Sequence, residues 1–310
     1  MNKVYKIFSG KSRNDQREVR FAKKDTGSAV AFLSPTLIIF FTFILFPVFF
    51  SFYLSFQKWN SFTWSGSFIG LDNYARMLDS EEFWLVLKNT AVYTIGTVPL
   101  NMIISLLVAY GLNRKLAGKK ILRTLFFAPV VISPVAAALI WRWLYDPNFG
   151  LVNYSLGILG IDSVNWLNNP SAAMFALIGM GVWKTFGVNM ILFSAGLNAI
   201  PDSYYEAATI DGAGAWSKFW HITLPLLSPT TFFIMVMSMI GSFQVFDIVY
   251  VLTSGGPLGS TKVLVFYIYE YAFKFNGEMG FASAVSYTLF VILFILTMVQ
   301  VKYIKNKVFS

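Results

Sequence analysis

The chain has 310 residues, of which 56% are hydrophobic and only 13% are charged. In soluble domains roughly a quarter of the residues are charged. This composition therefore excludes an ordinary soluble protein and indicates a chain surrounded by lipid. The net charge of +9 comes from clustered basic residues, which disfavours nucleic-acid binding, and the absence of cysteine excludes disulfides and thiolate metal sites.

Residues 1–28 form a basic, polar N-terminal arm. The apolar run that follows lacks a small-residue cleavage site, so we do not expect a cleavable signal peptide. The arm is either a topology anchor attracted to anionic lipid or a tail that docks a partner.

Six segments are long and apolar enough to cross a bilayer core, which takes about 20 helical residues. They are residues 29–56, 86–112, 121–144, 172–197, 226–252 and 280–303. Prolines inside or at the ends of several of them favour bundled helices, because neighbouring helices satisfy the carbonyls that proline frees. The sequence therefore predicts an all-α membrane protein with six transmembrane helices.

Lysine and arginine are distributed unequally between the two sides of these spans. The basic connections hold Lys3, Lys6, Lys11, Arg13, Arg17, Arg20, Lys23, Lys24, then Arg114, Lys115, Lys119, Lys120, Arg123, and finally Lys302, Lys305, Lys307. The alternate connections hold Lys58 and Arg76, none at 145–171, and Lys262 and Lys274. By the positive-inside rule we expect both termini, and the connection between spans four and five, to be cytoplasmic.

Span two carries a polar stripe with helical spacing. Its members are Thr90, Thr94, Thr97, Asn101 and Ser105. Residues at this spacing share one helix face, and a polar face in lipid must meet other helices or a water-filled path. Pore lining and helix packing both account for it.

Span four places Lys184 near its midpoint, with Thr185 and Asn189 beside it. A charge at this depth is a functional candidate unless carbonyls or a carboxylate of a neighbouring helix hold it for structural reasons. Both interpretations of Lys184 remain open at this stage.

In span five, Ser238, Gly241 and Ser242 share a face, with Gln244 and Asp247 nearer the outer end. Small residues at these positions permit either close helix contact or a substrate cavity.

Catalytic chemistry is poorly supported by the composition. One histidine and no cysteine cannot build an ordinary zinc site, and no phosphate-binding loop is present, so we expect no metal site, no catalytic residues and no ATP hydrolysis by this chain. His221 is interpreted as a capping or interface residue. Energy for any transport must then come from an ion gradient or from a partner ATPase.

The stretch between spans four and five has a distinct local pattern. Ser203 followed by Glu206 predicts a capping box that opens a short helix, and Gly212 after Asp211 predicts its left-handed end. A second short helix is expected at 215–219, and Thr223 with Pro225 is expected to start span five. The prediction is a bracket of two short helices on the cytoplasmic face.

Glu206-Ala207-Ala208, Gly212 and the following Ile222-x-Leu224-Pro225 resemble the EAA signature of ABC-importer membrane subunits. GLNAIPDSYYEAATIDGAGAW, FQVFDIVYVLTSGGP and LFFAPVVISPVAAALIWRWLYDPNFGLVN are similar to the carbohydrate importers of the oligosaccharide-uptake class, such as the maltose, lactose and glycerol-3-phosphate permease subunits. The resemblance covers roughly residues 30–305. It implies the type I ABC importer transmembrane fold in its compact six-span form, with a core domain at 86–304.

The resemblance implies roles for two sets of residues. The loop at 202–225 would couple to the ATPase subunit through Glu206, Ala207, Ala208, Asp211, Gly212, Ile222, Leu224 and Pro225. The substrate would contact Lys184, Thr185, Asn189, Ser238, Gly241, Ser242 and Gln244. Lys184 in place of small or neutral contacts is compatible with an acidic sugar.

The resemblance also implies the partners and the place of action. These are a second homologous permease subunit, two copies of an ABC ATPase that carry ATP and Mg, an extracellular or periplasmic solute-binding protein, and a carbohydrate. The expected localisation is multi-pass in the bacterial cytoplasmic membrane. The main alternative is an ion-coupled secondary transporter using Lys184 and Asp247; a membrane-embedded enzyme and a permease for amino acids or metals are weaker alternatives.

Overall fold

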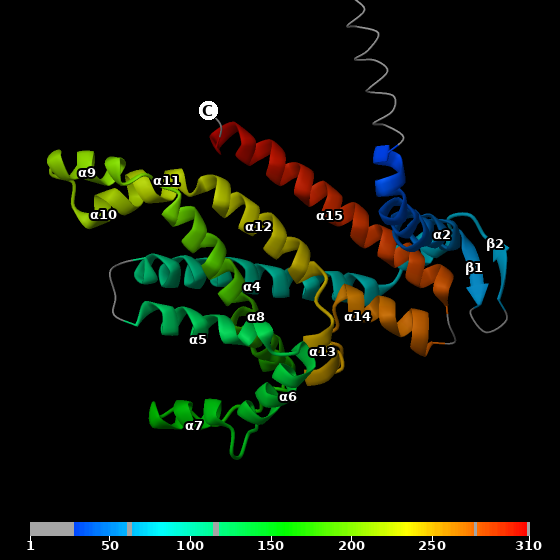
Figure 1. Cartoon of the computed structure of the whole chain (residues 1–310). Coiled ribbons are helices and arrows are strands. Elements are labelled where there is room, and N and C mark those ends of the chain that lie inside the picture. The colour runs from blue at the N-terminus through cyan, green and yellow to red at the C-terminus, as the bar shows by residue number, and fades with distance from the viewer. Residues whose placement is uncertain (1–27, 61–63, 114–117, 276–277, 309–310) are drawn as a thin grey trace, which may run out of the picture. The chain divides into compact units, whose positions relative to one another are not determined.

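The computed structural model describes residues 28–60, 64–113, 118–275 and 278–308 (Figure 1). The chain folds as two compact units, one ending at Leu54 and one beginning at Ser55. The predicted basic arm lies, apart from Ser28, outside the described residues.

The first unit is a single apolar helix. It runs from Ser28 to Ser55 and includes a π-helical turn, η1 (Phe41–Leu45), followed by α2 (Phe46–Ser55). Its large side chains are exposed within the chain, for example Phe32 at 86% and Phe43 at 73%. An apolar surface of this extent needs lipid or another protein around it, and the helix confirms the span predicted at 29–56.

The second unit opens with a β-hairpin that the sequence pattern did not predict. Strand β1 (Gln57–Asn60) pairs antiparallel with β2 (Ser65–Phe68), and the short helix α3 (Asp72–Leu78) follows. The Asn73 amide donates to the carbonyls of Ser55 and Gln57, both at 2.9 Å, and so ties α3 to the start of the hairpin. We call this end of the unit the hairpin side.

Span two is α4 (Glu81–Leu112), which starts five residues before the predicted 86–112. Ser80 caps it, because its Oγ accepts the Phe83 N–H at 3.3 Å. Span four is α8 (Pro170–Asn198), and span six is α15 (Met279–Val308). Each agrees with its predicted span to within a few residues.

Span three is not a straight helix across 121–144. It consists of α5 (Lys119–Val131) and α6 (Pro134–Leu144), which meet at an angle of 101°. Proline disfavours the helical conformation of the residue before it, and Ser133 accordingly has an extended ψ of 136°. The prediction of one unbroken span is wrong for this reason; α7 (Leu151–Ile158) follows α6.

Span five is also interrupted. Helix α12 (Ser228–Phe243) has Gln244 as its C-cap, and α13 (Asp247–Leu252) begins three residues after this cap. Beyond it, α14 (Leu264–Tyr269) and the π-helical turn η3 (Glu270–Lys274) lead to α15. Among the described residues, five helices can cross a membrane, or six if α5 and α6 form one span, so the predicted helical membrane fold is confirmed.

The core of the second unit lies along α4 and α8, which pack side by side. One cluster of buried apolar side chains joins α4, α6, α8 and α13, and includes Tyr93, Ala138, Leu177 and Val249. Helix α5 packs against α8, while α6 packs against α13 (Figure 1). The two broken spans therefore have their second halves in contact with each other.

Candidate translocation cavity and coupling bracket

The connection between spans four and five folds into two short helices at the end of α4 opposite the hairpin. These are α9 (Asp202–Ile210) and α10 (Ala215–Lys218), followed by the π-helical turn η2 (Phe219–Thr223) and α11 (Leu224–Leu226). The rings of Tyr110, near the end of α4, and Phe219 lie 5.0 Å apart. We call residues 202–225 the bracket and this end of the unit the bracket side.

The bracket begins differently from the prediction. Pro201 is the N-cap of α9 and no side chain caps the helix, so Ser203 lies inside it and the predicted capping box with Glu206 is wrong. Asp202 in the first turn supplies the negative charge that a helix N-terminus favours. Thr223 lies within η2 and span five proper starts at Ser228, three residues after Pro225.

The end of α9 agrees with the prediction. Gly212 has a left-handed φ of +79°, and its N–H donates to the Thr209 carbonyl at 3.1 Å. The Ala213 N–H donates to Ala208 at 2.8 Å, which completes the hydrogen-bond pattern of a glycine-terminated helix. A Cβ at Gly212 would meet nothing within 4 Å, so the backbone conformation, and not lack of space, requires glycine here.

Few contacts hold the bracket together, and much of its surface is exposed. Lys218 Nζ donates to Thr209 Oγ1 at 2.7 Å, and the Tyr205 and Thr223 hydroxyls are 3.1 Å apart. Ile210 is 87% exposed and Trp216 is 74% exposed. Exposed apolar side chains beside a helix pair mark a surface that a partner can bind.

The predicted coupling residues divide by exposure within this surface. Glu206, Ala207, Asp211, Gly212 and Pro225 are exposed, whereas Ala208, Ile222 and Leu224 are half-buried. His221 Nδ1 lies 3.0 Å from the Ser217 carbonyl oxygen, one turn earlier. Glu206 lies in the middle of α9, so its side chain is available to a partner and has no capping role.

A cavity of about 490 Å³ lies among α4, α8, α12 and the start of α13. Its apolar lining includes Tyr93, Phe233, Met237 and Ile248. Its polar lining is Thr97, Asn101, Thr185, Asn189, Ser238 and Ser242.

Side-chain hydrogen bonds between three spans organise the polar wall of the cavity. Asn101 on α4 donates to Thr185 Oγ1 of α8 at 2.7 Å. The Asn189 amide donates to Asn101 Oδ1 at 2.7 Å and to Ser238 Oγ of α12 at 2.9 Å. These bonds fix the orientation of the amide and hydroxyl groups in the wall and occupy the N–H donors of Asn101 and Asn189.

Five of the seven predicted substrate-contacting residues line this cavity. They are Thr185, Asn189, Ser238, Gly241 and Ser242. A Cβ at Gly241 would meet nothing within 4 Å, so this glycine faces open space. Lys184 and Gln244 are not among the lining residues. Substrate contact stays a prediction for all seven.

The stripe on span two lies partly at the cavity and partly between packed helices. All five members are buried. Thr97 and Asn101 line the cavity. Ser242 Oγ donates to Thr94 at 3.0 Å, and Ser105 Oγ donates to the Phe186 carbonyl at 2.9 Å, so these residues join helices.

The ammonium group of Lys184 donates hydrogen bonds to backbone carbonyls of span three. Nζ donates to Pro129 at 2.7 Å, to Val130 at 3.2 Å and to Ile132 at 2.5 Å. This arrangement favours the structural interpretation of Lys184 over contact with an acidic sugar.

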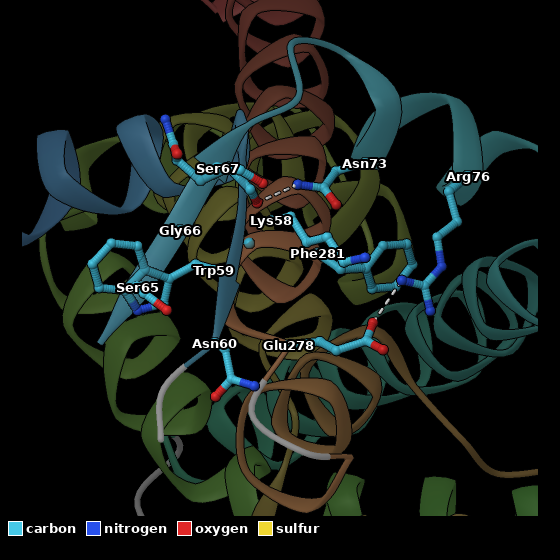
Figure 2. A pocket seen from close by; sticks show the side chains of 12 residues that line it. Lys58, Trp59, Asn60, Ser65, Gly66, Ser67, Asn73, Arg76, Glu278 and Phe281 are labelled. Atoms are coloured by element: carbon cyan, nitrogen blue, oxygen red, sulfur yellow. Dashed lines mark hydrogen bonds and ion pairs between the residues drawn. The ribbon is translucent and has the colours of Figure 1, made fainter. Parts of the chain in front are cut away.

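A second pocket, of about 600 Å³, lies on the hairpin side (Figure 2). Both strands, α3 and the first turn of α15 line it. Arg76 forms an ion pair with Glu278 at 2.6 Å, and its guanidinium lies 4.6 Å from the centre of the Phe281 ring. The sequence pattern indicated Arg76 only for topology, because nothing local pairs it with a residue 202 positions away.

A cluster of charges braces the same side. Lys262 binds Glu82, at the start of α4, at 2.7 Å and Glu270 in η3 at 2.8 Å. Burial would lower the pKa of Lys262, but hydrogen bonds and charge interactions with the two carboxylates outweigh it, so that the pKa is raised. No group of three His, Asp or Glu side chains suited to a metal ion occurs in the described part of the chain.

A bundle of apolar helices with a cavity between them, and an exposed helical bracket at one end, defines a multi-pass membrane transport subunit. The chain belongs to the family described as "Binding-protein-dependent transport system inner membrane component", whose profile matches residues 82–309. This membership sets aside the alternative of an ion-coupled secondary transporter.

Curated relatives and solved structures agree with the family. The probable ABC transporter permease protein YesP of Bacillus subtilis is 38% identical over 300 residues, covering 95% of this chain and 96% of the relative. The trehalose/maltose transport system permease protein MalF of Thermococcus litoralis is 38% identical over 269 residues, covering 86% and 90%. A bacterial alginate ABC transporter in complex with alginate pentasaccharide-bound periplasmic protein matches with a TM-score of 0.81 at 24% identity, covering 92% of this chain and 96% of that chain. The structural match confirms the ABC importer permease fold.

Proposed function

We propose that this chain is one permease subunit of an ATP-driven, binding-protein-dependent importer of a carbohydrate in a bacterial cytoplasmic membrane. Its relatives include subunits named for trehalose/maltose and arabinooligosaccharide transport. The cavity supports the same substrate class, because it combines apolar and aromatic walls with oriented amide and hydroxyl groups. Such groups suit a ligand that carries many hydroxyls on an apolar ring.

The observation that carries the mechanism is the exposed bracket at one end of α8. The bracket continues directly from α8, which lines the cavity, and leads into α12, which lines it as well. A partner that moves the bracket therefore moves two walls of the cavity together. With the bracket side cytoplasmic, two ATPase subunits carrying ATP and Mg would supply this motion, one through Glu206 and its neighbours on this chain.

The family supports the remaining partners in this proposal. A second, homologous permease subunit would complete the cavity, and a solute-binding protein would deliver the carbohydrate to the hairpin side. ATP binding can shift the access equilibrium only through contacts that differ between the two states, and we assign these contacts to the bracket.

The test is uptake by the complete complex in proteoliposomes, with the solute-binding protein added on one side. We expect accumulation of a labelled carbohydrate that requires ATP on the bracket side and persists with proton and sodium ionophores. Accumulation that collapses with ionophores, or transport of an amino acid and no carbohydrate, would contradict the proposal. A catalytic-glutamate variant of the ATPase subunit is the matched control for ATP leakage.

A further inference from the structure

The VWKTFGVNM segment of α8 contacts both halves of the broken span three. Trp183 packs against Trp141 of α6 in an edge-to-face geometry, with ring centres 5.5 Å apart. Gly187 lies against α5, where a Cβ would come within 2.6 Å of the Phe126 carbonyl oxygen. Lys184 lies between them in sequence and binds the bend itself.

The ammonium of Lys184 replaces hydrogen bonds that the bend removes. Helix α5 ends at Val131, so its last carbonyls have no partners within the helix, and Pro134 brings no N–H to them. An ammonium has three donors, and Lys184 Nζ contacts three carbonyls of this segment, those of Pro129, Val130 and Ile132. A cation at this position also complements the negative end of the α5 dipole.

Helix α6, the second half of the bent span, lies next to another part of the cavity wall. Helix α6 packs against α13 (Figure 1). Val245, which lies just before α13, and Ile248, in its first turn, line the cavity. On α8 itself, Thr185, the residue after Lys184, lines the cavity. Lys184 and its three carbonyl acceptors are not among the residues that line the cavity.

We propose that Trp183, Lys184 and Gly187 form a clamp that fixes the bend of span three, and that Lys184 positions the cavity wall for transport without touching the substrate. This role goes beyond the proposed function, since it would hold for any solute carried through this cavity. It requires a cation at position 184 and close approach of α5 at position 187.

The chain contains no cysteine, so reporters and rescue groups can be placed one at a time. In the complete complex, Val245→Cys reports on the wall held by α6 and α13, and Val188→Cys reports on the α8 wall. We expect Lys184→Met to change the rate of maleimide labelling at Val245→Cys by about two- to fivefold, the effect of one helix-terminal charge. Labelling at Val188→Cys should change less than about twofold, by the same reasoning.

Transport provides the second readout. Lys184→Met should lower ATP-driven uptake of maltotriose, or of the best neutral probe, and of trigalacturonate by the same factor. Gly187→Ala, which pushes α5 away, should reproduce the labelling change with the lysine retained. A selective loss of trigalacturonate uptake with unchanged labelling at Val245→Cys would assign Lys184 to the substrate and overturn the proposal.

Chemical rescue separates the charge from the bulk of the side chain. Lys184→Cys is treated with 2-aminoethyl methanethiosulfonate, which adds an ammonium, or with propyl methanethiosulfonate, which adds a neutral chain of similar length. The wild-type complex is treated in parallel to report on cysteines of the partners. Recovery of ATP-driven uptake with the ammonium reagent alone supports the clamp. Equal recovery with both reagents, or no recovery with either, contradicts it.

The labelling outcomes, unlike the uptake outcomes, concern the resting complex, so they are independent of the proposed carbohydrate. A complex that carries a different solute but shows the labelling change retains the clamp and loses the proposed function. A complex that carries carbohydrate but shows unchanged labelling retains the proposed function and loses the clamp.

Discussion

The bracket and the cavity wall are built in opposite ways, although α8 runs directly from one to the other. The bracket takes its shape from neighbours in sequence, such as the hydrogen bonds around Gly212, and leaves Ile210 and Trp216 exposed. The wall takes its shape from residues far apart in sequence, since Asn189 binds Asn101, 88 positions away, and Ser238, 49 positions away. The comparison shows a region with an exposed apolar surface beside a region of long-range internal hydrogen bonds, and it agrees with the proposed roles of the bracket as a coupling surface and the cavity as a path.

Charge reversal in the bracket is the strongest way to test this contrast. We expect Glu206→Lys to reduce uptake at least about tenfold, because it reverses the charge at an exposed surface of contact. Insertion and maleimide labelling of Val188→Cys in the cavity should remain normal, since Glu206 contributes nothing to the wall. Ser203→Ala is the matched control, as Ser203 does not cap α9. Normal uptake and normal ATPase recruitment by Glu206→Lys would contradict the coupling role.

Filling the cavity should produce the opposite combination. Gly241→Phe places a ring where a Cβ meets open space, so we expect normal ATPase recruitment with uptake reduced at least about tenfold. Pull-down of the ATPase subunit and uptake are measured on the same membranes. Gly241→Ala is the control and should retain most uptake. If both variants transport normally, the cavity is not the path.

Removing Asn189 tests how much the wall depends on its long-range bonds. Asn189→Leu leaves Asn101 Oδ1 and Ser238 Oγ without this donor and should destabilise the chain by about 1–3 kcal/mol. Thermal unfolding of the detergent-purified complex measures the loss. Thr209→Val removes the hydroxyl that binds Lys218 in the exposed bracket and should cost less than about 1 kcal/mol. Equal losses of stability for the two variants would contradict the difference between the cavity wall and the bracket.

The charges of the hairpin side give a smaller effect. Lys262→Met removes a largely buried partner of Glu82 and Glu270, so we expect a loss of about 1–2 kcal/mol at neutral pH. Arg76→Met breaks a more exposed pair with Glu278 and should cost less than about 1 kcal/mol.

The pH dependence checks the assignment to Lys262. Because its pKa is raised in the folded state, the stabilisation is complete below the unfolded value of about 10.4 and is lost as pH rises through the folded value. The difference between wild type and Lys262→Met should therefore be constant near neutral pH and disappear in strong alkali. Thermal unfolding across this range would contradict the assignment if the difference grew with pH.

The sequence predicted what depends on local pattern. Apolar length located the spans, and glycine chemistry located the end of α9 at Gly212. Local rules failed where two of them competed. Helix α9 begins after Pro201, which is its N-cap in place of the predicted Ser203. At Pro134 the apolar run divides into two helices that meet at 101°.

The cavity could be predicted only in part. Helical spacing placed Ser238, Gly241 and Ser242 on one face, and the cavity lies on that face. The same reasoning could not decide which way Lys184 points, because its acceptors become available only when span three bends. The Arg76–Glu278 pair was out of reach for a similar reason, since 202 residues separate its members.

One set of hydrogen bonds made by α4 bears on the order in which the chain is assembled. The Thr90 hydroxyl oxygen accepts the backbone N–H of Leu264 at 3.0 Å, and the Asn89 amide donates to the carbonyls of Gly259 and Lys262 at 2.9 and 3.0 Å. Span two is synthesised about 170 residues before these partners. A nascent chain therefore inserts span two before these hydrogen bonds can form. They form only when the segment before span six has been synthesised. Release from the ribosome before that point would leave the Asn89 and Thr90 side chains without these partners.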